Sequence, residues 1–263
     1  MKYKLILGML CVVTAIAHAQ ERKAVDSLTF DKPITDYSID VSGNIYVALE
    51  GGSITKYSPE LDSLFTYSPV QVGNVKLLEA GNGLRIFAFY DYYQEYLITD
   101  RFLTQPVRAK FSSATLDFVE IASQSQDNNI WLVENSGLRL VKYSPATQTI
   151  LTETFLSSIV DSRNPSFSFV KEYQNQVFLV DKNSGIYVFD NLGNFSRKIP
   201  VKTDKCLFYS TKITYVQGNE LIVSDLYKQD EIREKIGHLI VKNVMLFKSN
   251  VYIIKPQKIL RLQ

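Results

Sequence analysis

The chain has very few of the residues that most often carry catalysis, metal binding or covalent cross-linking. Its 263 residues include two cysteines, two histidines and one tryptophan. Cys11 and His18 lie within the first twenty residues, which leaves Cys206 and His238 for the rest of the chain. A single cysteine cannot form an intramolecular disulfide, and one cysteine with one histidine falls short of the three or four ligands of a zinc site. Stability therefore has to come from a hydrophobic core.

The sequence also lacks a hydrophobic run long enough to cross a membrane. Its longest apolar stretch, residues 5–17, is well short of the roughly 20 residues that a spanning helix needs. Two lysines precede this stretch, and the small-residue motif AHA follows it at 17–19. This pattern is typical of a cleaved secretory signal peptide. We therefore predict a signal peptide over residues 1–19, a mature chain over residues 20–263 without a transmembrane span, and export to the periplasm or the exterior.

An excess of one charge is also missing from the mature chain. The two signal-peptide lysines, Lys2 and Lys4, are part of the total of 29 basic residues, so 27 remain against 27 acidic residues. A chain without net charge has no overall field that attracts nucleic acid or anionic lipid. We expect no nucleic-acid partner.

The most informative feature present is an internal repeat. Six short apolar runs rich in β-branched and aromatic residues recur, each just after a turn that contains asparagine. The runs begin at Ile45, Ile86, Ile130, Val177, Leu221 and Val251. Consecutive runs therefore lie 41, 44, 47, 44 and 30 positions apart, and four of these five steps fit one four-stranded propeller blade per repeat.

The order of segments within a repeat supports four antiparallel strands per blade. The first repeat predicts strands over residues 34–40, 45–49, 54–57 and 63–67, and the third over residues 118–122, 129–133, 138–143 and 150–155. The motif KYSP occurs identically at 56–59 and 142–145. In the fifth repeat we expect the third strand near residues 229–235. An all-β propeller explains this regularity better than a β-sandwich, which would not repeat a four-strand unit.

The last repeat has room for only three strands, at residues 244–247, 251–254 and 259–262. The N-terminal segment DSLTFDKP at 26–33 is similar to DSLFTYSP at 62–69, which is the outermost strand of the first repeat. We therefore expect residues 28–30 to supply the missing outer strand, because an open strand edge promotes aggregation. The prediction is an all-β, six-bladed β-propeller of four-stranded antiparallel blades in a single domain, with the last blade closed by an N-terminal strand.

The repeats resemble those of NHL-type six-bladed propellers, a likeness carried by DNNIWLV at residues 127–133. A narrower likeness, to short secreted propellers of Bacteroidota type, rests on GLRIFAFY at 83–90 and LITDRFL at 97–103. Streptogramin lyase is also similar, but such an enzyme is expected to use a histidine, of which the mature chain has only His238. These resemblances imply blade geometry and no particular reaction.

Few residues of the mature chain suit catalysis. His238 follows Gly237 at the start of an apolar segment, and the sequence assigns it neither a nucleophile nor an orienting group. Cys206 begins the apolar segment CLFY, which is typical of a packed, unreactive thiol. We predict no catalytic residue, no metal ligand and no cofactor.

Acidic residues suggest an alternative. Five acidic residues each follow the predicted second strand of a repeat, which would place all of them on one face of the ring. They are Glu50, Asp91, Glu134, Asp181 and Asp225. Each carboxylate could cap its own turn. Alternatively, the carboxylates could converge near the axis on Ca²⁺ or another divalent cation, as in gluconolactonase-type propellers, which the chain would then resemble.

Tyrosines suggest a binding surface instead. Tyr90, Tyr92, Tyr93 and Tyr96 crowd the predicted second and third strands of the second repeat and the loop between them. Exposed tyrosines beside polar residues are typical of recognition surfaces, although packing between blades also uses aromatic residues. We predict a secreted, non-enzymatic module that binds a protein or a cell-envelope component through these four residues. The alternative function is a divalent-metal-dependent, lactonase-like hydrolase.

Overall fold

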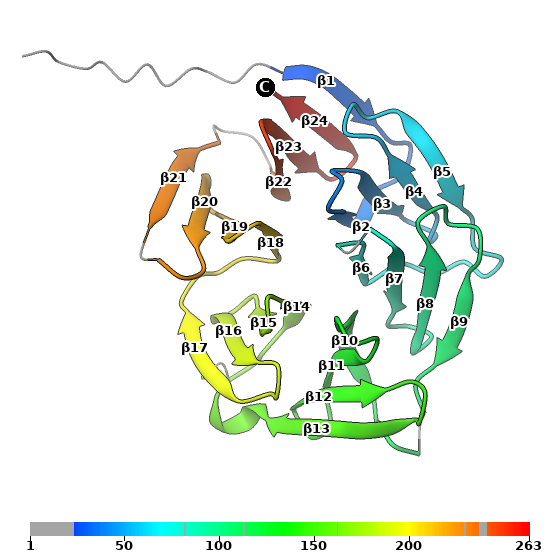
Figure 1. Cartoon of the computed structure of the whole chain (residues 1–263), viewed down its shortest axis with the longest axis vertical. Helices are drawn as coiled ribbons and strands as arrows, with labels where there is room; N and C mark the ends of the chain where they lie inside the picture. Colours follow the sequence, from blue (N-terminus) through cyan, green and yellow to red (C-terminus); the bar gives the residue numbers. More distant parts are fainter. Residues whose placement is uncertain (1–23, 82, 113, 162, 229, 237–240) are drawn as a thin grey trace, which may run out of the picture.

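The computed structural model describes residues 24–263 apart from residues 82, 113, 162, 229 and 237–240. Over these residues the chain forms six four-stranded antiparallel sheets, arranged as blades around one axis (Figure 1). The predicted all-β, six-bladed propeller is confirmed. The predicted signal peptide and His238 lie outside the described residues.

Each blade begins with its innermost strand, near the ring axis, and ends with its outermost strand. Blade 1 contains β2 (Ile34–Ile39), β3 (Ile45–Leu49), β4 (Ile54–Tyr57) and β5 (Ser63–Tyr67). Blade 2 contains β6 (Leu77–Glu79), β7 (Arg85–Tyr90), β8 (Glu95–Asp100) and β9 (Val107–Lys110). Blade 3 contains β10 (Val119–Gln124), β11 (Ile130–Glu134), β12 (Arg139–Ser144) and β13 (Thr149–Phe155), which a 3₁₀ turn, Leu156–Ser158, follows. Blade 4 contains β14 (Phe167–Tyr173), β15 (Gln176–Asp181), β16 (Gly185–Asp190) and β17 (Phe195–Ile199). Blade 5 contains β18 (Cys206–Tyr209), β19 (Lys212–Gln217), β20 (Glu220–Asp225) and β21 (Glu231–Lys235). Blade 6 contains β22 (Asn243–Phe247), β23 (Asn250–Lys255), β24 (Lys258–Leu262) and β1 (Ala24–Thr29).

The burial of a strand depends on its distance from the ring axis. All five residues of β11, with the sequence IWLVE, are buried, because neighbouring blades cover both faces of this part of the sheet. The outer strand of the same blade, β13, is exposed at every second residue, and β21 is exposed along its whole length. The recurring apolar runs therefore form the core between blades, which is why they are continuous rather than alternating.

The repeated KYSP motif has a physical basis in the third strands of blades 1 and 3. Lys56 lies opposite Tyr46 in the sheet, and its Nζ atom lies 5.3 Å from the centre of the tyrosine ring. Lys142 lies opposite Trp131 in the same way, at 5.4 Å. Both repeats thus use a cross-strand pair of a lysine and an aromatic ring.

The ring closes as the sequence predicts. β1 pairs with β24, so that Leu28 lies opposite Ile259, and the N–H of Phe30 donates to a carbonyl just before β24 at 2.9 Å. On the other side of the joint, the turn after β2 contains Gly43 with a φ of +88°. A β-carbon there would lie 2.3 Å from the Phe247 ring of blade 6, so glycine lets the first and last blades meet.

The fifth repeat differs from the expectation. Leu221 lies in β20, the third strand of blade 5, whereas the second strand is β19 (Lys212–Gln217). Residues 231–235 form the outermost strand, β21, instead of the predicted third strand. The step from Leu221 to Val251 is only 30 positions because Leu221 lies in a third strand, whereas Val251 lies in the second strand of blade 6, β23. The second strand, β19, is polar at both ends, at Lys212 and Gln217, and contains Thr214 between its apolar residues, so its apolar run is short.

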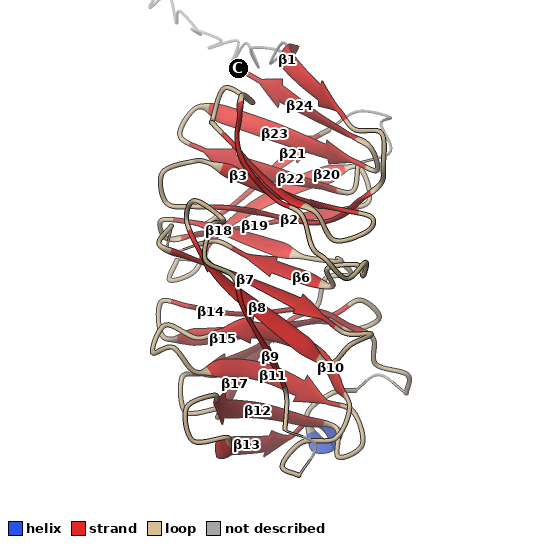
Figure 2. Cartoon of the chain, turned by 90° about the vertical axis from the view of Figure 1, so that its right-hand side faces the viewer, coloured by secondary structure: helices blue, strands red, loops and turns tan. Residues whose placement is uncertain are grey.

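The ring has two different faces, seen at either side of the edge-on view in Figure 2. At one face, the innermost strands end and turn into the second strands; we call it the chamber face, after the cavity described below. At the other, the linker face, the chain passes from each blade to the innermost strand of the next. Within the described part of the chain, no helix is long and apolar enough to cross a membrane.

Candidate functional site: an axial chamber

A cavity of about 480 Å³, the axial chamber, opens on the chamber face. All six blades contribute to its lining, mostly through the ends of innermost strands and the turns that follow them. The lining residues are Ile39, Asp40, Val41, Glu79, Gly81, Arg85, Gln124, Ser125, Gln126, Lys171, Glu172, Tyr173, Phe208, Tyr209, Ser210, Leu246 and Phe247. A volume of this order is typical of small-molecule sites.

Blades 4, 5 and 6 give the chamber an aromatic wall, formed by Tyr173, Phe208, Tyr209 and Phe247. The ring of Tyr173 stacks on that of Phe208, with 4.6 Å between the ring centres. Tyr209 and Phe247 meet edge to face at 5.9 Å. The hydroxyl of Tyr173 donates to the carbonyl of Ser210 at 2.7 Å, and burial raises the pKa of Tyr173. These contacts hold the wall in place without a ligand.

An ion pair occupies another side of the chamber. Nζ of Lys171, at the end of β14, lies 2.6 Å from Oε1 of Glu79, at the end of β6. The same oxygen accepts the N–H of Gly81 at 2.6 Å. A β-carbon at Gly81 would lie 2.5 Å from this oxygen and 2.6 Å from the lysine nitrogen. A side chain at this position would therefore displace the ends of Glu79 and Lys171.

Glu172 is the second acidic group at the chamber, and it has a different environment. The residue is 8% exposed. Its Oε2 atom accepts a hydrogen bond from Nε1 of Trp131 at 2.8 Å and another from the hydroxyl of Ser125. Among the described residues no lysine or arginine forms an ion pair with it. Glu172 is thus a buried carboxylate held by two neutral donors.

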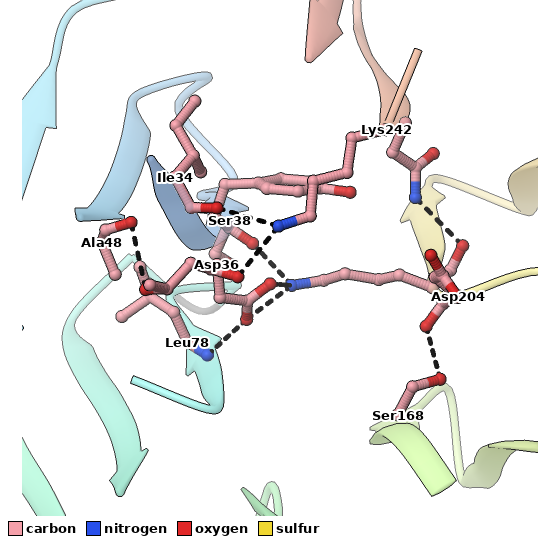
Figure 3. A network of polar contacts seen from close by, with 12 residues as sticks. Ile34, Asp36, Ser38, Ala48, Leu78, Ser168, Asp204 and Lys242 are labelled. Atoms are coloured by element: carbon pink, nitrogen blue, oxygen red, sulfur yellow. Dashed lines mark hydrogen bonds and ion pairs between the residues drawn. The ribbon is translucent and has the colours of Figure 1, made fainter. Parts of the chain in front are cut away.

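A network of charged groups, drawn in Figure 3, forms the floor of the chamber, because Lys205 lines a small second cavity that shares four residues with the chamber lining. Nζ of Lys205 lies 2.8 Å from Oδ1 of Asp36, donates to the carbonyl of Tyr37 at 2.6 Å, and lies 4.7 Å from the centre of the Tyr37 ring. The second oxygen of Asp36 accepts the N–H of Leu78 at 2.6 Å. Lys242, whose pKa burial lowers, donates to two carbonyls of β2. Lys205 and Asp36 are both buried, so an ion pair between the linker to blade 5 and the innermost strand of blade 1 lies on this side of the chamber.

The five acidic residues selected from the sequence do not gather on the axis. Four follow second strands and lie on the linker face, whereas Asp225 follows the third strand β20 and lies on the chamber face, so the expected common face is wrong for it. Oε2 of Glu134 lies 2.8 Å from Nε of Arg139 in the neighbouring strand. Asp181 accepts the N–H of Ser166 at 2.8 Å.

The other acidic residues also bond locally. Asp91 accepts the N–H of Tyr92 at 2.9 Å, and Asp225 accepts the hydroxyl of Thr211 at 2.9 Å. Glu50 is exposed in the turn after β3. Nowhere in the described ranges do three or more histidine, cysteine or acidic side chains come close enough to hold a metal ion. The geometry favours the interpretation that these carboxylates fix turns.

The four selected tyrosines divide into two pairs. Tyr90 is 0% exposed and Tyr96 is 6% exposed, because both side chains point into the space between blades. A partner cannot contact them, which corrects the expectation for these two residues. Tyr92 is 83% exposed in the turn after β7. The hydroxyl of Tyr93 donates to the carbonyl of Val72 at 2.6 Å, so Tyr93 fixes the linker to blade 2.

Sequence reasoning missed the chamber because it searched beyond the second strands of the repeats. The signal was present at the ends of the innermost strands, where charged residues interrupt apolar segments: Glu79 after two leucines, and Lys171-Glu172 before Tyr173. Their convergence becomes visible only when the six strand ends are placed around one axis.

No family model and no curated protein matches the chain. Solved propellers do match in structure. The β-propeller domain of Cps50 (Swd1) from Myceliophteria thermophila has a TM-score of 0.64 and 8% identity, over 92% of this chain and 99% of that one. A catalytically inactive virginiamycin B lyase from Staphylococcus aureus, solved with quinupristin, has a TM-score of 0.62 and 12% identity over the same shares.

A third similar structure is the extracellular domain of the two component system BT4673 from B. thetaiotaomicron. It has a TM-score of 0.58 and 12% identity, over 88% of this chain and 33% of that one. At these identities the likeness shows a common fold alone. The chain is a β-propeller whose structural neighbours include proteins of quite different kinds.

Proposed function

We propose that this protein is a non-enzymatic binding module that receives a small amphipathic ligand group in its axial chamber. The observation that carries the proposal is the composition of the chamber: an aromatic wall and a buried carboxylate held by hydrogen bonds, that of Glu172, line the same cavity. Binding sites typically combine apolar surface with a few polar groups that fix orientation. The group can belong to a free molecule or project from a protein or envelope component.

The arrangement of the acidic residues supports binding over hydrolysis. A lactonase-like enzyme would need oxygen ligands that converge on a divalent cation. Here four of the acidic residues named from the sequence bond to nearby turns and strands, as Glu134 does with Arg139, and the fifth, Glu50, is exposed. The pair of Lys171 and Glu79 is likewise satisfied internally.

Export of the protein is part of the same proposal. It is supported by the signal-peptide pattern in residues 1–19 and by the resemblance to short secreted propellers of Bacteroidota type. A ligand met outside the cytoplasm would reach the chamber through the open mouth on the chamber face. The tyrosine surface around Tyr92 and Tyr93, on the linker face, remains a separate proposed contact with a protein partner.

The chamber can be tested with three compounds that share a phenyl ring and differ in their polar group: phenethylamine, phenethyl alcohol and phenylacetate. Binding to the mature protein would be measured by ligand-observed NMR. Gln126→Trp places a large side chain at an exposed position of the chamber lining. Val70→Trp, at a fully exposed position of the linker before β6, is the matched control.

We expect at least one compound to bind the wild-type protein and the Val70→Trp variant, and to lose most of its binding to the Gln126→Trp variant. Equal binding of every compound to all three proteins would contradict a site in the chamber. So would an absence of binding by all three compounds at millimolar concentration.

A further inference from the structure

We infer that the group bound in the axial chamber is positively charged and that Glu172 selects it. This inference rests on the proposed function and names the ligand chemistry of the same site: an ammonium or guanidinium group next to an aromatic or aliphatic body. Such a group occurs in free amines and at the ends of lysine and arginine side chains.

Glu172 can accept further hydrogen bonds from a ligand. An ionised carboxylate can accept about four hydrogen bonds, and Glu172 accepts two, both at Oε2, from Ser125 and Trp131. Among the described residues no donor reaches Oε1. Since Glu172 lines the cavity, this oxygen is the acceptor that remains for a ligand.

The charges that line the chamber also favour a cationic ligand. Removing a carboxylate from water is unfavourable unless an opposite charge or several donors compensate for the lost hydration. The neighbouring cation, Lys171, is paired with Glu79 on another blade. Three acidic residues line the chamber, Asp40, Glu79 and Glu172, against two basic ones, Lys171 and Arg85. A ligand with one positive charge would balance this lining.

The aromatic wall of the chamber favours a cationic ligand as well. Tyr173 and Phe208 lie in the same cavity as Glu172, and the face of an aromatic ring attracts a cation. The chain already holds an ammonium group in this way at the floor, where Lys205 lies between the Asp36 carboxylate and the Tyr37 ring. The chamber repeats the combination of carboxylate and aromatic ring, while its own lysine, Lys171, is paired with Glu79.

The test compares the same three compounds by isothermal titration calorimetry. We expect the wild-type protein to bind phenethylamine at least about tenfold more tightly than phenethyl alcohol, and phenylacetate least tightly. Glu172→Gln keeps an oxygen that can accept the Ser125 and Trp131 bonds but removes the charge. In this variant the preference for the amine over the alcohol should disappear.

Glu60→Gln is the matched control, because it removes one acidic charge at an exposed turn outside the chamber lining. It should leave the preference unchanged. Trp131 is the single tryptophan of the chain, so its indole N–H signal in an NMR spectrum should shift when the amine binds. A lysine-containing peptide and its acetylated form distinguish a projecting side chain from a free amine as the source of the charge.

Two results would overturn the inference and leave the binding chamber intact. One is equal or tighter binding of the alcohol or the acid in the wild-type protein. The other is an amine preference that survives Glu172→Gln. By contrast, binding that the Gln126→Trp variant does not weaken would remove the proposed function itself.

Discussion

Lys171 and Glu79 are 92 positions apart in the sequence, yet Nζ of the lysine lies 2.6 Å from Oε1 of the glutamate. Their strands belong to blades 4 and 2, which are separated by blade 3. The ion pair therefore connects two blades that are not neighbours in the ring, at the wall of the axial chamber. It joins parts of the ring that share no sheet.

Removing the lysine should destabilise the fold. Lys171→Met leaves the largely buried carboxylate of Glu79 without its cation, and we expect the free energy of unfolding to fall by about 2 kcal/mol in urea titrations. Lys110→Met removes an exposed lysine that lies 3.6 Å from Glu95, and should cost under about 1 kcal/mol. Similar losses in the two variants would show that the Lys171 pair contributes no more than a surface pair.

Loss of the closing strand should be far more damaging. Deletion of residues 20–33 removes β1 and exposes the edge of β24. We expect the melting temperature to fall by roughly 10 °C or more and aggregation to increase. Deletion of residues 20–23 alone, which leaves β1 complete, serves as the control. A protein without residues 20–33 that melts like the wild type would contradict closure by β1.

Cys206 should be unreactive in the folded protein. Burial raises the pKa of its thiol to about 12, and the residue is 0% exposed. Because the thiolate is the reactive form, a disulfide reagent at mildly alkaline pH should label the protein only when the fold opens. The rate of labelling, followed by absorbance, should rise steeply with added urea. Rapid stoichiometric labelling without denaturant would contradict the packing of β18.

Stability should depend on pH through Glu134. Hydrogen bonds from Arg139 lower the pKa of this carboxyl below its usual value of 4.5. A depressed pKa in the folded state means that the stabilisation is present above about pH 4.5 and is lost as the pH falls through the folded-state pKa.

Arg139→Gln tests this dependence in urea titrations from neutral pH to about pH 3. The variant should be less stable than the wild type at neutral pH, and the difference should shrink as the pH falls. A difference that stays constant over the whole range would show that the arginine acts through packing alone.

The two exposed or half-exposed tyrosines should respond differently to mutation. Tyr92→Ala should change the free energy of unfolding by less than about 0.5 kcal/mol, because the side chain is 83% exposed. Tyr93→Phe loses the hydrogen bond to the Val72 carbonyl, and should cost about 1 kcal/mol. Equal effects of the two variants in thermal melts would contradict the anchoring role of Tyr93. Any loss of partner binding should therefore be sought first in the Tyr92 variant.

The architecture was predictable because its signals are local. A turn needs a residue that tolerates positive φ, and Asn128 and Asn175 adopt φ values of +66° and +60°. In blades 1 and 5, the glycine just before the asparagine takes this role, with +88° at Gly43 and +60° at Gly218. An asparagine or a glycine therefore indicates each of these turns, and the repeat can be predicted from the sequence alone.

The site was not predictable from local signals, because it depends on the whole ring. Lys205 and Asp36, which pair at the chamber floor, are 169 positions apart. No spacing rule connects them, since each lies at a different point of a different repeat. The environment of Glu172 likewise depends on Trp131 in the neighbouring blade.

The pairing of β1 with β24 also sets the order of events while the chain is made. β1 is the first strand of the ring to be synthesised, but its partner, β24, is the last. Ala24 can therefore pair with Leu262 only after the other strands have been made. Bringing such distant segments together is entropically unfavourable, and contacts of this kind slow folding. Blades 1 to 5 can form in the order of synthesis, whereas blade 6 can form only after β22, β23 and β24 have been made, although its outer strand, β1, is made first. The pairing of β1 with β24 can therefore complete the ring only after every other blade has been synthesised.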